Sequence, residues 1–254
     1  MTDIAGNART PGAFARAILF YLLFYLWTLV YGLLVIPFLI APRRLCVAIA
    51  RIWNRGAMAL VRHVAGIDFE IRGRANIPDR PAVIAVKHQS AFETLALPII
   101  LDCPALVVKR ELFWIPIFGW YLARVGNIGI DRGAGPTALR AIVRRAREEL
   151  AHGRHVVIFP EGTRVAPGTR HDYGPGVAAL YIMLEVPVVP VALNSGLFWG
   201  RRHIAKTRGT VTIEFLPAIA PGLSRQQFMA ELRRAIDEGS DRLVAEGPRQ
   251  IAAK

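Results

Sequence analysis

The strongest constraint in the sequence is an uncharged run at residues 17–41, AILFYLLFYLWTLVYGLLVIPFLIA. As an α-helix it would extend about 37 Å, against roughly 30 Å for the hydrocarbon core of a bilayer. It is too long for a signal-peptide core, which takes roughly 7–15 residues. A core helix of a soluble protein is seldom apolar on every face, so the run predicts a helix in contact with a membrane.

The residues after this run predict a second helix. Pro37 is expected to kink or end the first helix near Val35, because proline lacks the N–H that the helix needs. In the next stretch, RRLCVAIARIWNRGAMALVRH, four arginines fall within a helical stripe about 40° wide, at positions 44, 51, 55 and 62. Such a stripe beside an apolar face is typical of a helix lying on an anionic bilayer, although a solvated face is the alternative.

Arginines flank both ends of the run, so the positive-inside rule gives no orientation. We therefore expect residues 1–66 to form a helical hairpin anchored in one leaflet, with a simple spanning helix as the alternative. Residues 67–254 are expected to form a separate α/β domain. The two cysteines, Cys46 and Cys103, make no disulfide framework, so we expect this domain to lie in a reducing compartment.

The formal net charge of +13 predicts an anionic partner, which is a nucleic acid, a membrane surface or an acidic substrate. Residues 1–66 hold seven arginines and one acidic residue, so nearly half of this charge lies beside the apolar run. Basic residues interleaved with exposed aromatic residues are not evident, so no nucleic acid is expected as a partner.

Beyond residue 66, short apolar runs alternate with helical stretches, which predicts a central, partly parallel mixed sheet flanked by helices. Expected strands lie at residues 68–73, 82–87, 105–109, 155–159, 186–193 and 210–216. A helix is expected at residues 136–151. A final helix is expected to begin at Ser224, where Ser-x-x-Gln forms a capping box.

Polar residues follow two of these strands, and sites in such sheets form where strands end. In KHQSAFET, His88 follows the strand at 82–87 and Glu93 comes five residues later. Ser90 and Glu93 match a capping box, which gives Glu93 a structural interpretation. In the other interpretation, Glu93 holds one nitrogen of His88 as a donor and leaves the other free to accept a proton. No G-x-S-x-G motif supplies a nucleophile, which suggests that the substrate brings its own hydroxyl.

The segment FPEGTR follows another strand, with Gly162 permitting a tight turn and Arg164 suited to bidentate contact with phosphate. An exposed loop with a salt bridge between Glu161 and Arg164 is the alternative. Lys109 and Arg132 lie near other strand or loop ends, so with Arg164 they are candidates for an anion pocket.

Four blocks in order, His-x4-Glu, GNIGIDR, FPEGTR and VPVVPVAL, cover about residues 83–193. This pattern resembles the glycerolipid acyltransferases, most closely the bacterial 1-acyl-sn-glycerol-3-phosphate acyltransferases. The resemblance implies that His88 is the general base and that Glu93 orients it. It also implies a set of acceptor-binding residues: Lys109, Arg132, Glu161, Gly162, Thr163 and Arg164.

The resemblance implies acyl transfer from acyl-CoA or acyl carrier protein to the sn-2 hydroxyl of lysophosphatidic acid, giving phosphatidic acid. It implies no metal and no cofactor besides the thioester co-substrate. The expected partners are membrane lipids, lysophosphatidic acid and the donor, at the inner membrane with the catalytic domain on the cytoplasmic face. The alternatives are another lysolipid acceptor such as a lyso-ornithine lipid, a hydrolase using the same base, and a non-catalytic membrane-binding protein.

Two positions depart from the family pattern, since Glu93 replaces the usual aspartate and Gly129 stands where a bulky residue is common. Backbone N–H groups near the helix start at Ser90 are candidate donors to the oxyanion. The aromatic segment at residues 113–121 is a candidate lining for an acyl tunnel.

Overall fold

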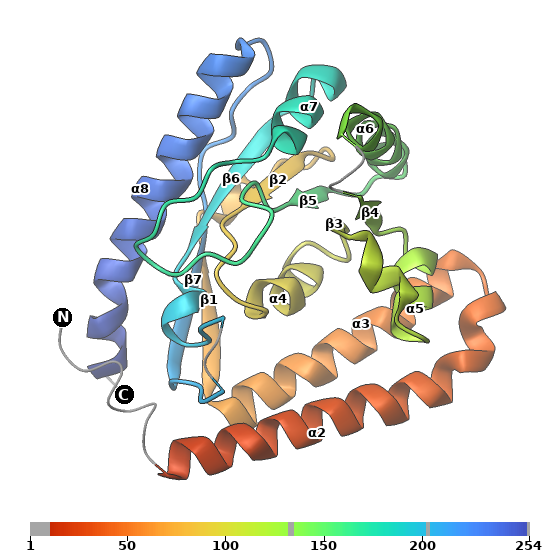
Figure 1. Ribbon diagram of the computed structural model, residues 1–254, viewed down its shortest axis with the longest axis vertical. Coiled ribbons are helices and arrows are strands. Elements are labelled where there is room, and N and C mark those ends of the chain that lie inside the picture. The colour runs from red at the N-terminus through yellow and green to blue at the C-terminus, as the bar shows by residue number, and fades with distance from the viewer. Residues whose placement is uncertain (1–10, 132–134, 202–203, 253–254) are drawn as a thin grey trace.

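The computed structural model of the chain describes residues 11–131, 135–201 and 204–252. It begins with a helical hairpin of α2 (Pro11–Val35), the 3₁₀ helix η1 (Ile36–Ile40) and α3 (Arg43–Leu60). The two long helices lie side by side along one edge of the molecule (Figure 1). The indole N–H of Trp27 donates to the carbonyl of Trp53 at 3.2 Å, which ties the helices together. The hairpin and the end of α2 at Val35 confirm the prediction made from Pro37.

Seven strands form one mixed sheet in the order β1-β7-β6-β2-β5-β3-β4. Their bounds are β1 (Ile67–Arg72), β2 (Val83–Val86), β3 (Ala105–Lys109), β4 (Ile128–Ile130), β5 (Val156–Ile158), β6 (Val188–Leu193) and β7 (Gly209–Phe215). Strands β2 to β6 are parallel, whereas β7 runs antiparallel to β6 and parallel to β1. The predicted α/β class with a partly parallel mixed sheet is therefore confirmed. Strand β4 was not predicted.

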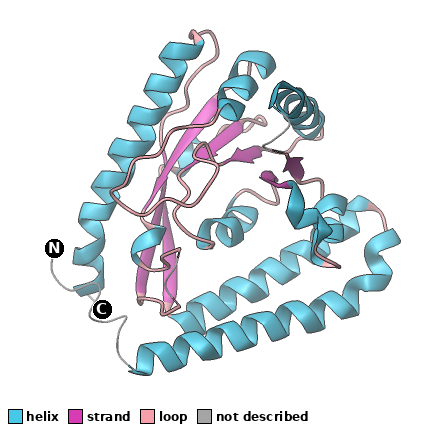
Figure 2. Ribbon diagram, viewed as in Figure 1, coloured by secondary structure: helices cyan, strands magenta, loops and turns pink. Residues whose placement is uncertain are grey.

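Helices cover both faces of the sheet (Figure 2). Their bounds are α4 (Phe92–Ile100), α5 (Phe118–Arg124), α6 (Gly135–Ala151), α7 (Pro175–Leu184) and α8 (Arg225–Ala252). Along β2, Ile84 and Val86 pack on the side of α4 and the hairpin, and Val83 and Ala85 pack on the side of α6, α7 and α8. This alternation divides the core into two layers, as the period of a strand requires.

The hairpin and the sheet share one of these layers. Phe20 of α2 and Ala57 of α3 are fully buried in the same cluster as the side chains of β2, β6 and β7. The chain passes from the short π-helix η2 (Val61–Ala65) into β1 through Gly66. The division into two domains at residues 66 and 67 stays a prediction. Because β2 to β6 are parallel, their carboxyl ends meet at one edge of the sheet, where the polar blocks of the sequence lie.

Candidate active site

His88 lies two residues beyond the end of β2 and pairs with Glu93 in the first turn of α4. Its Nδ1 atom lies 3.0 Å from Oε1 of Glu93. Because the carboxylate can only accept, Nδ1 carries the proton and Nε2 is left as the acceptor. The ring stacks on Phe159 with a centroid distance of 4.1 Å, which fixes its plane. The His88 side chain is 14% exposed, so a substrate can reach it.

The carboxylate of Glu93 is the centre of a buried hydrogen-bond network. Oε1 also accepts the backbone N–H groups of Gln89 and Ser90, at 2.7 and 2.8 Å. Oε2 accepts the hydroxyls of Ser90 and Ser195, at 2.9 and 2.8 Å. Burial raises the pKa of Glu93, but the hydrogen bonds from His88 and Ser90 outweigh it, so the pKa lies below its ordinary value. Glu93 therefore stays ionised beside the base.

These contacts correct one expectation. The N–H groups of Gln89 and Ser90 donate to Glu93, and the N–H of Phe92 donates to the hydroxyl of Ser90 at 3.0 Å. Because each N–H is already used, these three are not available to an oxyanion, and the prediction is wrong for them.

Ser195 is a site residue that the sequence reasoning missed. It follows β6, which pairs with β2, so the sheet brings residues 88 and 195 to the same edge. The signal that points to it is the polar pair Asn194 and Ser195 directly after the apolar strand VPVVPVAL. Both hydroxyls near the base, from Ser90 and Ser195, donate to Glu93, so neither is arranged as a nucleophile for His88.

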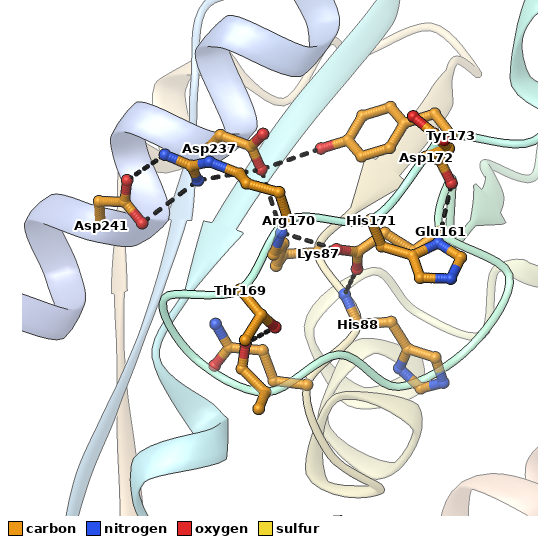
Figure 3. Close-up of polar contacts among 12 residues, drawn as sticks. Lys87, His88, Glu161, Thr169, Arg170, His171, Asp172, Tyr173, Asp237 and Asp241 are labelled. Carbon is orange, nitrogen blue, oxygen red and sulfur yellow. Dashed lines mark hydrogen bonds and ion pairs between the residues drawn. The ribbon is translucent and has the colours of Figure 1, made fainter.

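Glu161 lies behind His88 in a buried charge network (Figure 3). Its Oε2 atom accepts the backbone N–H of His88 at 3.0 Å, and its Oε1 atom lies 2.6 Å from Nζ of Lys87. Lys87 also contacts Asp237 of α8 at 3.0 Å. Burial raises the pKa of Glu161, and the Lys87 ammonium opposes that rise.

The Glu161 side chain has no exposed surface. The expected contact between Glu161 and an acceptor is therefore not supported, because the carboxylate points into the protein. Its geometry is that of a positioning residue, which fixes the main chain at His88. Sequence reasoning missed Lys87 and Asp237, since they are 150 positions apart.

The rest of FPEGTR crosses the end of β2. Gly162 adopts a φ of +63° and its N–H donates to the Phe159 carbonyl at 2.9 Å, which makes the expected tight turn. The N–H of Val165 donates to the His88 carbonyl at 2.8 Å. Thr163 and Arg164, both half-buried, therefore lie next to the base.

Burial raises the pKa of the Tyr21 hydroxyl in α2, and the positive charge of Arg164 opposes that larger rise. The buried Lys206 donates to the same hydroxyl at 2.7 Å. The Arg201 guanidinium donates to the Arg164 carbonyl at 3.1 Å. These contacts place cationic side chains where α2 meets the α/β domain.

Lys109 and Arg132 are the other candidates for the anion pocket. Lys109 is exposed at the end of β3, two strand positions from β2, which corresponds to roughly 10 Å. Arg132 lies outside the described residues. The structure thus brings His88, Glu93 and residues 161–164 together and leaves Lys109 at a distance.

The fold and the site define an α/β protein in which a histidine at a strand end is held by a buried carboxylate. The sequence model of the Acyltransferase family matches residues 68–194. A 1-acyl-sn-glycerol-3-phosphate acyltransferase from Pseudomonas aeruginosa is 38% identical over 235 residues, which is 91% of each chain. Human 1-acyl-sn-glycerol-3-phosphate acyltransferase alpha is 29% identical over 162 residues, which is 63% of this chain and 57% of its own length.

The crystal structure of the 1-acyl-sn-glycerophosphate acyltransferase PlsC from Thermotoga maritima has the same fold. It matches with a TM-score of 0.72 and 24% identity, over 91% of this chain and 97% of that chain. The present chain belongs to the Acyltransferase family, which confirms the resemblance drawn from its four sequence blocks.

Proposed function

We propose that this protein transfers an acyl group from a thioester to the sn-2 hydroxyl of lysophosphatidic acid, giving phosphatidic acid. The observation that carries the proposal is the 3.0 Å contact between Nδ1 of His88 and Oε1 of Glu93. This contact orients a base. The relatives' names supply the acceptor, since the Pseudomonas protein is a 1-acyl-sn-glycerol-3-phosphate acyltransferase.

In the proposed reaction, Nε2 of His88 takes the proton of the acceptor hydroxyl as its oxygen attacks the thioester carbonyl. The tetrahedral intermediate collapses, the C–S bond breaks, and the imidazolium returns the proton to the departing thiolate. Glu93 stays ionised and stabilises the imidazolium, which its lowered pKa favours. The donor passes its acyl group directly to the acceptor, because the serines beside the base donate their protons to Glu93.

We assign Arg164 as the main ligand of the acceptor's phosphate. The phosphate of lysophosphatidic acid is on the carbon next to the reacting hydroxyl, so it must bind close to His88. Arg164 precedes Val165, whose N–H donates to the His88 carbonyl, whereas Lys109 ends a strand two positions away. Gly162 and Thr163 complete the wall of this subsite. Lys109 would contribute longer-range attraction, and Arg132 is proposed as a further cationic contact with the acceptor. Binding of the phosphate positions the hydroxyl for attack.

Membrane association follows from α2. The stretch Pro11–Ile40 is long and apolar enough to cross a membrane, by length and composition. Its large side chains are open to solvent, with Leu22 61% and Leu34 69% exposed. The chain turns at η1, and α3 runs back beside α2 along one edge of the molecule (Figure 1). We therefore infer a hairpin held in one leaflet. The proposed position is the cytoplasmic face of the inner membrane, where the thioester donor is soluble and the lipid acceptor stays in the leaflet.

The test is acceptor-dependent thiol release by the detergent-purified protein. Palmitoyl-CoA, oleoyl-CoA and palmitoyl-acyl carrier protein are each supplied with lysophosphatidic acid, lysophosphatidylglycerol, a lyso-ornithine lipid or no acceptor. Release that requires lysophosphatidic acid and yields phosphatidic acid supports the proposal and identifies the donor. Release without an acceptor would identify a hydrolase, and preference for another lysolipid would reassign the acceptor.

A matched variant tests the phosphate assignment. Arg164→Ala should raise KM for lysophosphatidic acid about tenfold or more, because a charge-assisted contact is lost. Lys109→Ala should raise it less. Equal KM values in wild type and Arg164→Ala would contradict the assignment.

A further inference from the structure

An aromatic loop of the α/β domain is exposed beside the hairpin. This aromatic loop comprises residues 110–121, which include the 3₁₀ helix η4 (Arg110–Trp114) and the start of α5. Trp114 is 70% exposed, Trp120 48% and Ile115 43%. Neighbouring large apolar side chains with this much exposure form a patch, which is typical of an interaction surface. Phe113 and Trp114 also line an open cavity beside Gly129, so the expectation that residues 113–121 line an acyl tunnel stays a prediction.

The backbone holds this patch in a strained shape. Ile117 has a φ of +66° and a ψ of −62°, and the N–H of Phe118 donates to the Pro116 carbonyl at 2.7 Å. This is the rarer form of γ-turn, and a β-branched residue seldom adopts it. The turn reverses the chain between Ile115 and Trp120. Strain of this kind persists where surrounding contacts enforce it, and it is concentrated at functional positions.

The aromatic loop contacts the hairpin at the border of the exposed face of α2. Cγ2 of Ile117 lies 3.3 Å from the position that a Cβ on Gly32 would take. The Tyr121 hydroxyl donates to the Val35 carbonyl at 2.5 Å. Gly32 comes seven residues after Tyr25, so both residues lie on nearly the same face of α2. Tyr25 is 65% exposed. The patch is therefore continuous with the apolar surface of α2.

Cations lie directly beside the patch. Lys109 and Arg110 precede it and are both exposed, with Arg110 also paired to Asp131 at 3.4 Å. Arg124 ends α5 and is exposed as well. Tryptophans concentrate at the boundary between hydrocarbon and water, and basic side chains beside them meet anionic headgroups. A bilayer surface matches both the aromatic and the cationic parts, whereas a second copy of this chain would match only the apolar part.

We propose that the aromatic loop inserts into the headgroup boundary of the same leaflet that holds the hairpin. The inference rests on the proposed membrane anchoring by α2. Insertion gives the α/β domain a second membrane contact and sets Lys109 at headgroup level. An acceptor lipid then reaches the strand ends from the side, with its phosphate still in the plane of the headgroups.

The test measures depth at three positions. Cys46→Ala and Cys103→Ala remove the native thiols, both of which are buried. Single cysteines are then introduced as Leu34→Cys on α2, Ile115→Cys in the aromatic loop and Arg234→Cys on α8. Helix α8 covers the opposite face of the sheet from the hairpin (Figure 1). Each cysteine carries an environment-sensitive fluorophore, and the protein is reconstituted in vesicles of brominated phosphatidylglycerol and phosphatidylethanolamine.

The proposal predicts several-fold more quenching at positions 34 and 115 than at position 234. Quenching at 34 without quenching at 115 would overturn the insertion of the aromatic loop and leave the anchor intact. Quenching at 115 alone would support the insertion and contradict the anchor, and quenching at neither would overturn both. Trp120→Cys provides a second probe in the same loop if Ile115→Cys does not fold.

Activity gives an independent readout. Trp114→Ser combined with Trp120→Ser should raise the apparent KM for vesicle-borne lysophosphatidic acid about tenfold, because apolar contact with the leaflet is lost. The KM for a short-chain, monodisperse acceptor should not change. An equal effect on both acceptors would show that the tryptophans act inside the site, which would overturn the proposal.

Discussion

Oε1 of Glu93 accepts hydrogen bonds from Nδ1 of His88 at 3.0 Å and from the backbone N–H of Ser90 at 2.8 Å. One carboxylate oxygen therefore faces the imidazole and also caps the start of α4. The two interpretations left open by the sequence, a helix cap and an orienting carboxylate, are compatible in this geometry. Changes at Glu93 should consequently affect stability and activity together.

Glu93→Gln is expected to lower kcat about 10²- to 10⁴-fold, because a neutral amide cannot stabilise the imidazolium as the carboxylate does. It should also lower the free energy of unfolding by about 1–3 kcal/mol, since the amide nitrogen would face donors in a buried site. Glu93→Asp keeps a carboxylate and should lose less activity. Steady-state kinetics and urea unfolding measure both quantities. A Gln variant with wild-type kcat would exclude the orienting role.

Ser195→Ala should shift the acid sensitivity of the protein. The folded-state pKa of Glu93 lies below its ordinary value of 4.5. Its ionised form therefore stabilises the fold fully above that value, and this stability is lost as the pH falls through the lowered pKa. Removing the Ser195 donor raises the folded-state pKa of Glu93 toward its unfolded-state value. Tm should therefore be lower at neutral pH and should fall less on acidification, whereas kcat should begin to fall at a higher pH. Tm measured from neutral to acidic pH checks this.

The matched control for that series is Ser224→Ala, which removes an exposed cap of α8 far from the site. It should lower Tm by a similar amount at all pH values, without changing the size of the fall in Tm on acidification. A fall in Tm on acidification that is equal in wild type and Ser195→Ala would contradict the role given to Ser195.

Lys87→Met should lower the free energy of unfolding by about 3–5 kcal/mol, because it leaves the buried Glu161 without a cation and Asp237 with only the half-exposed Arg170 at 3.5 Å. Lys87 is only 3% exposed and contacts Glu161 at 2.6 Å and Asp237 at 3.0 Å. Adding Glu161→Gln and Asp237→Asn to the same chain should restore part of the loss. Chemical denaturation measures it, and a Lys87→Met protein as stable as wild type would contradict the network.

Gly129→Leu tests why this chain departs from its family at that position. A Cβ on Gly129 would lie 3.0 Å from Cε2 of Phe113, so a larger side chain at this position requires the ring to shift. The variant should lower the free energy of unfolding by about 1–3 kcal/mol through overpacking. Phe113→Ala combined with Gly129→Leu should recover stability relative to Gly129→Leu. A stable Gly129→Leu protein would show that Phe113 does not restrict the position.

Local patterns allowed much of the fold to be predicted. Pro37 marked the end of α2, and the capping box at Ser224 is present, with the Gln227 N–H bonded to the Ser224 hydroxyl at 3.3 Å. The pairing of His88 with Glu93 followed from a spacing of five across a helix start. These features depend on residues within one turn or one strand, which is the range that sequence periodicity reports.

The parts that were missed depend on pairing between distant residues. Strand β4 has three residues with Gly129 in the middle, so it carries no β pattern and forms by pairing with β3. Ser195 meets Glu93 only because β6 lies beside β2. The exposure of Trp114 and Trp120 depends on the turn at Ile117, which a β-branched residue does not signal.

The central claim is that His88 is the base, and the most direct measurement is the rate of phosphatidic acid formation by His88→Ala. The account predicts a fall in kcat of about 10²- to 10⁴-fold in a protein that still unfolds cooperatively, since general-base catalysis contributes that much. His171→Ala, which changes an exposed histidine, should keep the wild-type rate. A folded His88→Ala protein that forms phosphatidic acid at the wild-type rate would contradict the mechanism.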